Sequence, residues 1–121
     1  MTRDEILNMP AGREMDKLIA EKVTHINFHF AITFDTKKHY GSDLPFYSTD
    51  IAAAWEVIEV LSKDGYAPNL VNDDGGKWYL SFDGTQNLDP VTFVTAFTDV
   101  PELWCESASL AICRAALLAE V

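Results

Sequence analysis

The residues of this sequence that could do chemistry include two histidines, His25 and His29, spaced four positions apart. On a helix this spacing would direct both rings at one metal ion. The alternation of apolar and polar residues around them instead predicts a strand, where about 13 Å would separate them. We therefore interpret them as two polar residues on a strand surface, with a shared metal as the alternative. No metal ligand set is predicted.

The candidate nucleophiles lack the partners that nucleophilic catalysis requires. Cys105 has no histidine and acid nearby in sequence, and Cys113 fits a small, buried apolar residue on a helix. Ser48 is not in a GxSxG motif, and no GxGxxG or P-loop motif is present. Because no acid–base pair can be assembled, we predict a protein that is not an enzyme and uses no cofactor.

Arg114 is an isolated cation, the only one after Lys77, in an alanine-rich apolar helix. Arginine in such a place needs an acidic partner or a bound anion. Two interpretations stay open: a structural ion pair with Asp50, Glu56 or Asp99, and contact with a ligand.

Residues Tyr47-Ser48-Thr49 precede a predicted helix, whose free N–H groups could hold an anion or could simply be capped. Trp104 could stack on a planar ring. Tyr79 could also stack on a ring, whereas Trp55 and Trp78 lie on the faces of their helix and strand that are predicted to face the core. The predicted ligand-binding residues are Tyr47, Ser48, Thr49, Trp104 and Arg114.

These residues would be positioned by the clearest helical pattern of the chain. Ile51, Ala54, Trp55, Ile58 and Leu61 recur with the period of one helix face. Ser48 or Thr49 would cap this helix at its start, and Gly65 would end it in a left-handed conformation. We expect the remaining elements to pack on this face.

Further helices are predicted before and after this helix in the sequence. Thr2 and Glu5 have capping-box spacing, Pro10 starts a second helix that runs to Val23, and Ser107 or Ser109 caps the last one. The predicted core residues are Leu18, Ile19, Ile51, Trp55, Ile58, Leu61, Trp78, Leu80, Phe82, Phe93, Leu110, Cys113 and Leu117.

Period-two alternation predicts the strands. Ile26–Phe34 reads as a strand or the first arm of a hairpin, followed by a polar loop over 36–43. Further strands are predicted over 69–72, 77–83 and 91–98. The fold class is therefore α+β, a helix–antiparallel sheet–helix sandwich in the order α-(β)-α-β-β-β-α.

Composition limits the partners. The chain of 121 residues fits one domain and has a net charge of −10, which disfavours binding to nucleic acid or to an anionic membrane. The order α-β-β-β-α is shared with double-stranded RNA-binding domains, but those read phosphates with lysines that are absent here. No apolar run reaches the ~20 residues of a membrane span, and no signal peptide is evident. Two cysteines without a CxxC spacing predict a reduced, cytoplasmic protein.

Two motifs resemble a known family. The first motif is Pro45-Phe46-Tyr47-Ser48-Thr49-Asp50-Ile51-Ala52-Ala53-Ala54-Trp55-Glu56-Val57, and the second is Leu110-Ala111-Ile112-Cys113-Arg114-Ala115-Ala116-Leu117. Both are similar to the phage ABA sandwich domain family. A similar match is made by the run Pro10-Ala11-Gly12-Arg13-Glu14-Met15-Asp16. The resemblance covers most of the 1–121 domain, and 24–44 departs from it as a strand-and-loop insertion. It implies helix–sheet–helix layering and a phage accessory protein in the bacterial host cell.

Two functions are expected. The first is binding of a small anionic or nucleotide-like molecule, with which a phage could sequester a host immune signal. The alternative is a protein-interaction or structural module. In it, the stripe formed by Phe28, Phe30 and Phe34 would mediate self-association, so we expect a homo-oligomer.

Overall fold

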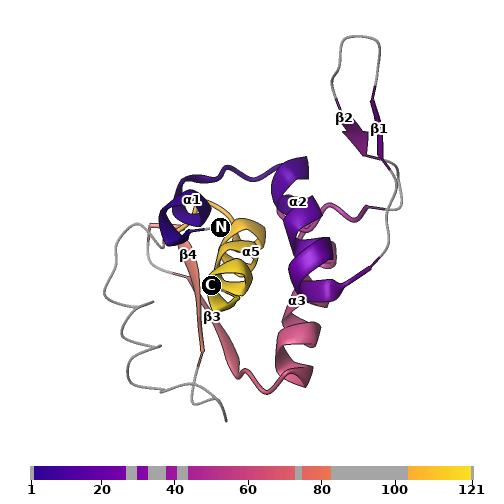
Figure 1. Ribbon diagram of the computed structural model, residues 1–121. Coiled ribbons are helices and arrows are strands. Elements are labelled where there is room, and N and C mark those ends of the chain that lie inside the picture. Colours follow the sequence, from indigo (N-terminus) through magenta and orange to yellow (C-terminus); the bar gives the residue numbers. More distant parts are fainter. Residues whose placement is uncertain are drawn as a thin grey trace.

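The last helix, α5 (Ala108–Ala119), lies at the centre of the structure (Figure 1). The computed structural model describes residues 2–26, 30–32, 38–40, 44–72, 75–82 and 104–120. Ser107 caps α5, since its hydroxyl accepts a hydrogen bond from the N–H of Leu110, as predicted. Most of its side chains are buried all round the helix, which is expected for a helix surrounded by protein. It packs against α3, β4, α1 and α2.

The two N-terminal helices both contact α5. Helix α1 (Arg3–Asn8) is capped by Thr2, whose side chain accepts from the N–H of Glu5, in agreement with the predicted capping box. Helix α2 (Arg13–Ile19) continues as a π-helical turn, η1 (Ala20–Thr24). His25 ends this turn in a left-handed conformation with φ of 56°. Ile26, at which the predicted strand begins, is therefore not part of a strand.

A short antiparallel hairpin projects from the body of the protein (Figure 1). It pairs β1 (Phe30–Ile32) with β2 (Lys38–Tyr40), with Phe30 opposite Tyr40. The prediction of a first hairpin arm is confirmed for β1. The predicted polar loop over 36–43 is wrong at 38–40, which forms the second arm. The neighbouring residues of the phenylalanine stripe, Phe28 and Phe34, lie outside the described residues.

Helix α3 (Ile51–Lys63) has the predicted length but not the predicted cap or orientation. Its N-cap is Asp50, whose carboxylate accepts from the N–H of Ala52, so the predicted capping by Ser48 or Thr49 is wrong. Trp55 and Ile51 are 53% and 49% exposed, which corrects their placement in the core. The buried line consists of Ala54 and Leu61, which belong to the predicted face, and of Val57, which does not. Gly65 follows the helix with φ of 96°, the left-handed residue that was predicted.

The second sheet pairs β3 (Pro68–Asn72) with β4 (Trp78–Phe82) in antiparallel register, with Leu70 opposite Leu80. Its edge continues at Cys105, which exchanges backbone hydrogen bonds of 2.7 and 2.8 Å with Trp78. Helix α5 packs on β4, and α3 contacts β3. The α+β class is confirmed, and the strand predicted over 91–98 lies outside the described residues.

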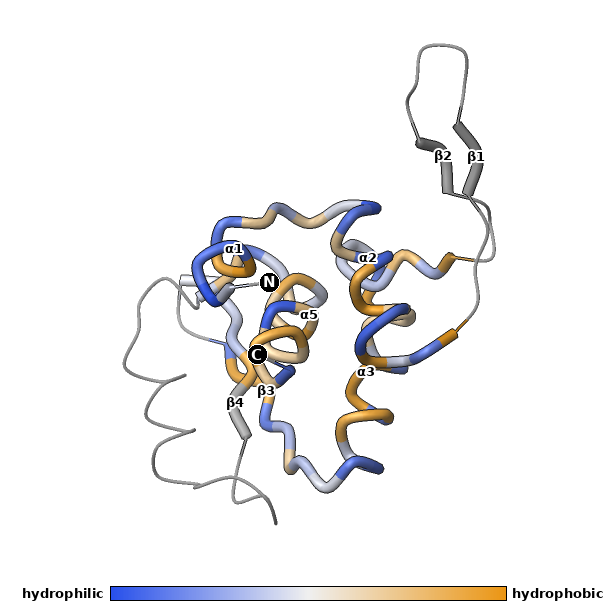
Figure 2. Tube along the Cα trace, in the orientation of Figure 1, coloured by the Kyte–Doolittle hydropathy of each residue, from blue (hydrophilic) through white to orange (hydrophobic). Residues whose placement is uncertain are grey.

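The apolar faces of these elements meet around α5 (Figure 2). Five predicted core residues are buried: Ile19, Leu61, Leu80, Cys113 and Leu117. A further four are half-buried, namely Leu18, Ile58, Trp78 and Leu110. The side chains of Phe82 and Phe93 lie outside the described part of the chain.

Candidate functional site

The predicted anion cradle at Ser48 is occupied by the protein's own side chains. Asp16 accepts hydrogen bonds from the Ser48 N–H at 2.8 Å and from its hydroxyl at 2.6 Å. The Ser48 oxygen in turn accepts from the N–H of Gly12 at 2.9 Å. Ser48 and Asp16 are both fully buried. The donors and acceptor that a ligand would need at Ser48 are therefore already engaged.

Arg13 completes this arrangement, which we call the Arg13–Asp16–Ser48 cluster. Its guanidinium lies 2.8 Å from the second carboxylate oxygen of Asp16 and donates to the carbonyl of Leu44 at 2.6 Å. It also stacks over the ring of Phe46, 3.8 Å from the ring centroid. The cluster joins α2 to the segment before α3, so two of the sequence motifs form one packing unit. These contacts hold the two segments together.

The neighbours of Ser48 divide between the interior and the surface. Tyr47 is buried, and its hydroxyl lies 3.1 Å from that of Thr24. Burial raises the pKa of Tyr47 above its ordinary value. Thr49 is exposed. None of the three lies among the residues that line the pocket described next, so the structure separates them from the other two predicted site residues.

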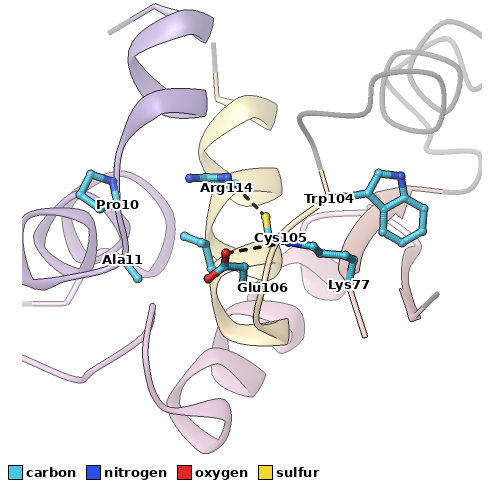
Figure 3. A pocket seen from close by; sticks show the side chains of 8 residues that line it. Pro10, Ala11, Lys77, Trp104, Cys105, Glu106 and Arg114 are labelled. Carbon is cyan, nitrogen blue, oxygen red and sulfur yellow. Dashed lines mark hydrogen bonds and ion pairs between the residues drawn. The ribbon is translucent and has the colours of Figure 1, made fainter. Parts of the chain in front are cut away.

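That pocket has a volume of about 410 Å³ and lies between the start of α5, the start of β4 and the segment after α1 (Figure 3). This volume is within the range of small-molecule sites. It brings together two of the predicted residues, Trp104 and Arg114. The lining residues are Pro10, Ala11, Lys77, Trp104, Cys105, Glu106, Leu110 and Arg114.

Arg114 reaches the pocket from the middle of α5. Its guanidinium donates to the carbonyl of Met9 at 3.1 Å and to the sulfur of Cys105 at 3.6 Å, while its Nε is buried without a partner. Within the described ranges no carboxylate lies within ion-pair distance of it. The predicted ion pairs with Asp50 and Glu56 are therefore absent, and Asp99 lies outside these ranges.

A second cation, which sequence reasoning missed, stands at the rim. The ammonium of Lys77 lies 3.9 Å from the carboxylate of Glu106, and both side chains are substantially exposed. An exposed pair at this distance is weak, because water screens the charges. The sequence signal for Lys77 was only that it is the last cation before Arg114; nothing marked Glu106.

Trp104 supplies the aromatic wall. The Tyr79 ring packs against the indole with centroids 4.3 Å apart and planes at 83°, an edge-to-face pair. Such a pair is favoured by the quadrupoles of the rings and restrains the indole. Trp104 is half-buried, so part of its surface remains open to a ligand.

The thiols near the pocket are poor nucleophiles. Burial raises the pKa of Cys105, and the nearby Arg114 guanidinium offsets only part of this effect. Burial raises the pKa of Cys113 strongly. Because the thiolate is the reactive form, neither cysteine is activated.

Metal-binding geometry is lacking in the part of the chain that the structure describes, where no group of three suitable side chains gathers. His25 is exposed at the end of η1, and His29 lies outside that part. None of the described helices has the length and apolarity of a membrane span.

Comparison with known proteins agrees with the fold. The Phage ABA sandwich domain matches residues 17–117, which include the cluster residue Ser48 and the pocket residues Lys77 and Arg114. No curated protein and no solved structure matches the chain significantly. The family match spans most of the 121 residues. This chain belongs to the phage ABA sandwich domain family.

Proposed function

We propose that the pocket at Arg114 binds a small anionic molecule with a planar ring. The observation that carries this proposal is the state of the Arg114 guanidinium. A guanidinium has five N–H donors, and only two hydrogen bonds from Arg114, to Met9 and Cys105, are formed within the described residues. Neither acceptor is a carboxylate, so its charge remains for an anion to neutralise.

The surroundings favour a ring attached to that anion. Arg114 and Lys77 can attract a phosphate or carboxylate group, and Trp104 offers an aromatic surface at the same pocket. An arginine fork binds such groups in two-point contact. The positive charge of these two residues is sufficient to attract an anion, even though the chain carries a net charge of −10. Salt screens the repulsion from distant surface charges more than it screens the attraction at contact distance.

Binding without catalysis fits the groups present. The two buried thiols have raised pKa values, and no histidine is among the described residues that line the pocket. A pocket of this kind would hold its ligand unchanged. In a phage protein this supports sequestration of a host small molecule, such as a nucleotide-like immune signal in the bacterial cytoplasm.

The test is calorimetric titration with nucleoside monophosphates and their cyclic forms. Arg114→Met should weaken binding at least tenfold, which corresponds to the loss of one charged hydrogen-bonding partner, about 1.5–3 kcal/mol. Arg3→Met is the matched control, because Arg3 lies on α1 and outside the pocket lining. Equal losses in both variants would show that only net charge matters. Unchanged binding by folded Arg114→Met protein would refute the proposal.

The second candidate function is self-association, favoured by the exposure of Ile51 and Trp55 one turn apart on α3. In an antiparallel two-fold pairing of α3 with its copy, Lys63 at one end would approach Asp50 at the other. Trp55→Glu would then dissociate the oligomer. Light scattering that finds a monomer at every concentration would exclude this candidate.

A further inference from the structure

We propose that the exposed face of α3 binds a basic helix of another protein, with an arginine of that helix as the anchor. No residue of α3 lines the pocket at Arg114. The inference therefore concerns a second surface and does not depend on the proposed function.

Two large apolar side chains of this face lie in water. Trp55 and Ile51 are one turn apart and are 53% and 49% exposed. The packing of α3 on the rest of the protein buries Ala54, Val57 and Leu61 instead. Tryptophan is enriched among the residues that dominate the free energy of protein association, because covering its ring removes a large apolar area from water. The face therefore offers a partner an apolar contact.

Beside this contact, four residues surround a hole of the kind used in helix–helix packing. Ala52, Trp55, Glu56 and Glu59 are exposed and lie at positions i, i+3, i+4 and i+7 of α3. Residues with these spacings are neighbours on a helix surface, and a side chain of a facing helix inserts between four of them. The small Ala52 leaves room for that side chain. The hole is bounded by one aromatic ring and two carboxylates.

The composition of the hole favours arginine as the side chain that enters it. Neither Glu56 nor Glu59 belongs to an ion pair formed within the described residues. An arginine can stack its guanidinium on Trp55 and donate to a carboxylate in two-point contact, while its aliphatic stem covers Ala52. An apolar side chain would instead bury carboxylates without a partner, which is costly. Lysine lacks the planar group that stacks and binds in this way.

A second copy of the chain fits this face less well than a basic partner does. Lys63 is the only cation of α3. In the antiparallel pairing that brings Lys63 to Asp50, the two-fold axis passes next to Glu56, so the two copies of this carboxylate meet. Parallel pairing would place both Glu56 and Glu59 against their copies. Each copy also carries a net charge of −10, which opposes association. Charge complementarity therefore points to another protein with a basic helix.

The test is a display selection on the full-length protein, with a library of alanine-based helical peptides randomised on one face. We expect the selected peptides to carry an arginine three or four positions from an apolar residue. The variant Glu56→Gln/Glu59→Gln should weaken the best peptide at least about tenfold, since charged hydrogen bonds are lost. Citrulline, which is neutral, should have a similar effect in place of the arginine. The two changes together should cost little more than either alone.

Two further variants test position and shape. Asp4→Asn/Glu5→Gln makes the same charge change on α1, which packs on α5, and should alter the affinity by no more than about twofold. Ala52→Leu keeps every charge but fills the hole, so it should also weaken the arginine peptide. Melting temperatures check that each variant is folded; all the changed positions are exposed.

The inference is wrong if the selection enriches no helix, or if the selected peptides lack arginine. It is also wrong if Glu56→Gln/Glu59→Gln and Ala52→Leu leave peptide binding unchanged, or if the α1 variant weakens it as much. A dimer that Trp55→Glu dissociates in light scattering would show that a second copy covers the face, which would likewise overturn the inference. None of these results bears on ligand binding at Arg114.

Discussion

Asp16 accepts two hydrogen bonds from Ser48, one from its backbone N–H at 2.8 Å and one from its hydroxyl at 2.6 Å, although the two residues are 32 positions apart. Both are fully buried, and Arg13 neutralises the carboxylate from the other side. This contact determines where the segment before α3 attaches to α2. The free energy of unfolding should therefore depend strongly on it.

We expect Asp16→Ala to lower the free energy of unfolding by about 3 kcal/mol. The change leaves Arg13 without its carboxylate and the buried Ser48 N–H without its acceptor, while the Ser48 hydroxyl keeps the Gly12 carbonyl at 3.1 Å. Urea denaturation measures the effect. Glu21→Ala is the control: Glu21 is exposed, its ion pair within the described residues is a 3.8 Å contact with Lys17, and the change should cost less than about 1 kcal/mol. Equal effects of the two changes would contradict the role of the cluster.

Trp55→Ala should cost less than about 1.5 kcal/mol, because half of this side chain is already in water. Leu117→Ala, at a fully buried position of α5, should cost about 2–5 kcal/mol. Thermal and urea unfolding of both variants give the comparison. A larger loss for Trp55→Ala would mean that its ring is covered in solution, for example by a second copy.

Stability should fall in alkaline solution because of Cys113. Burial raises the pKa of its thiol in the folded protein above the ordinary value near 9, so the folded state keeps a proton that the unfolded chain loses. The contribution is fully present below the ordinary pKa and declines as pH rises above it, by up to about 1.4 kcal/mol per pH unit. Cys113→Ala should flatten this decline in urea titrations at several pH values. An unchanged slope in that variant would refute the assignment.

His25→Gly should stabilise the protein by up to about 1 kcal/mol. His25 has φ of 56°, a conformation that costs free energy for any residue with a Cβ. His25→Val should destabilise, because a β-branched residue fits this region least well. The melting temperatures of the two variants test this geometry. A higher melting temperature for His25→Val than for His25→Gly would show that His25 is not left-handed in solution.

The local patterns of the sequence predicted much of the fold. Periodicity located α3 and α5, and Gly65 marked the end of α3 as expected. The orientation of α3 was predicted only in part: Ala54 and Leu61 of the predicted face are buried, but Ile51 and Trp55 are exposed and Val57 takes their place. A helical period is satisfied by either set of residues. Size and hydrophobicity favoured the tryptophan, whereas close packing on α5 admits the small Ala54.

The site was predictable only in part. Arg114 stood out because a lone cation in an apolar helix violates the usual pattern, and Trp104 was included for its ring. The acceptor of Arg114, the Met9 carbonyl, is 105 residues away, and Asp16 is 32 residues from Ser48. Such contacts depend on tertiary packing, and a single sequence gives no periodicity from which to infer them. Ser48 was therefore assigned to a helix cap, whereas its N–H and hydroxyl donate to Asp16.

The central position of α5 also affects how the chain acquires its structure during synthesis. A ribosome that has completed residues 1–107 has made α1, α2, α3 and the β3–β4 pair, but not the helix on which their apolar faces pack. These elements would stay loosely associated, with apolar surface open to chaperones, until α5 emerges. Closure then requires contacts across almost the whole chain, such as Arg114 with Met9, which slows folding relative to a protein of local contacts. Folding of the described elements should therefore await the synthesis of α5.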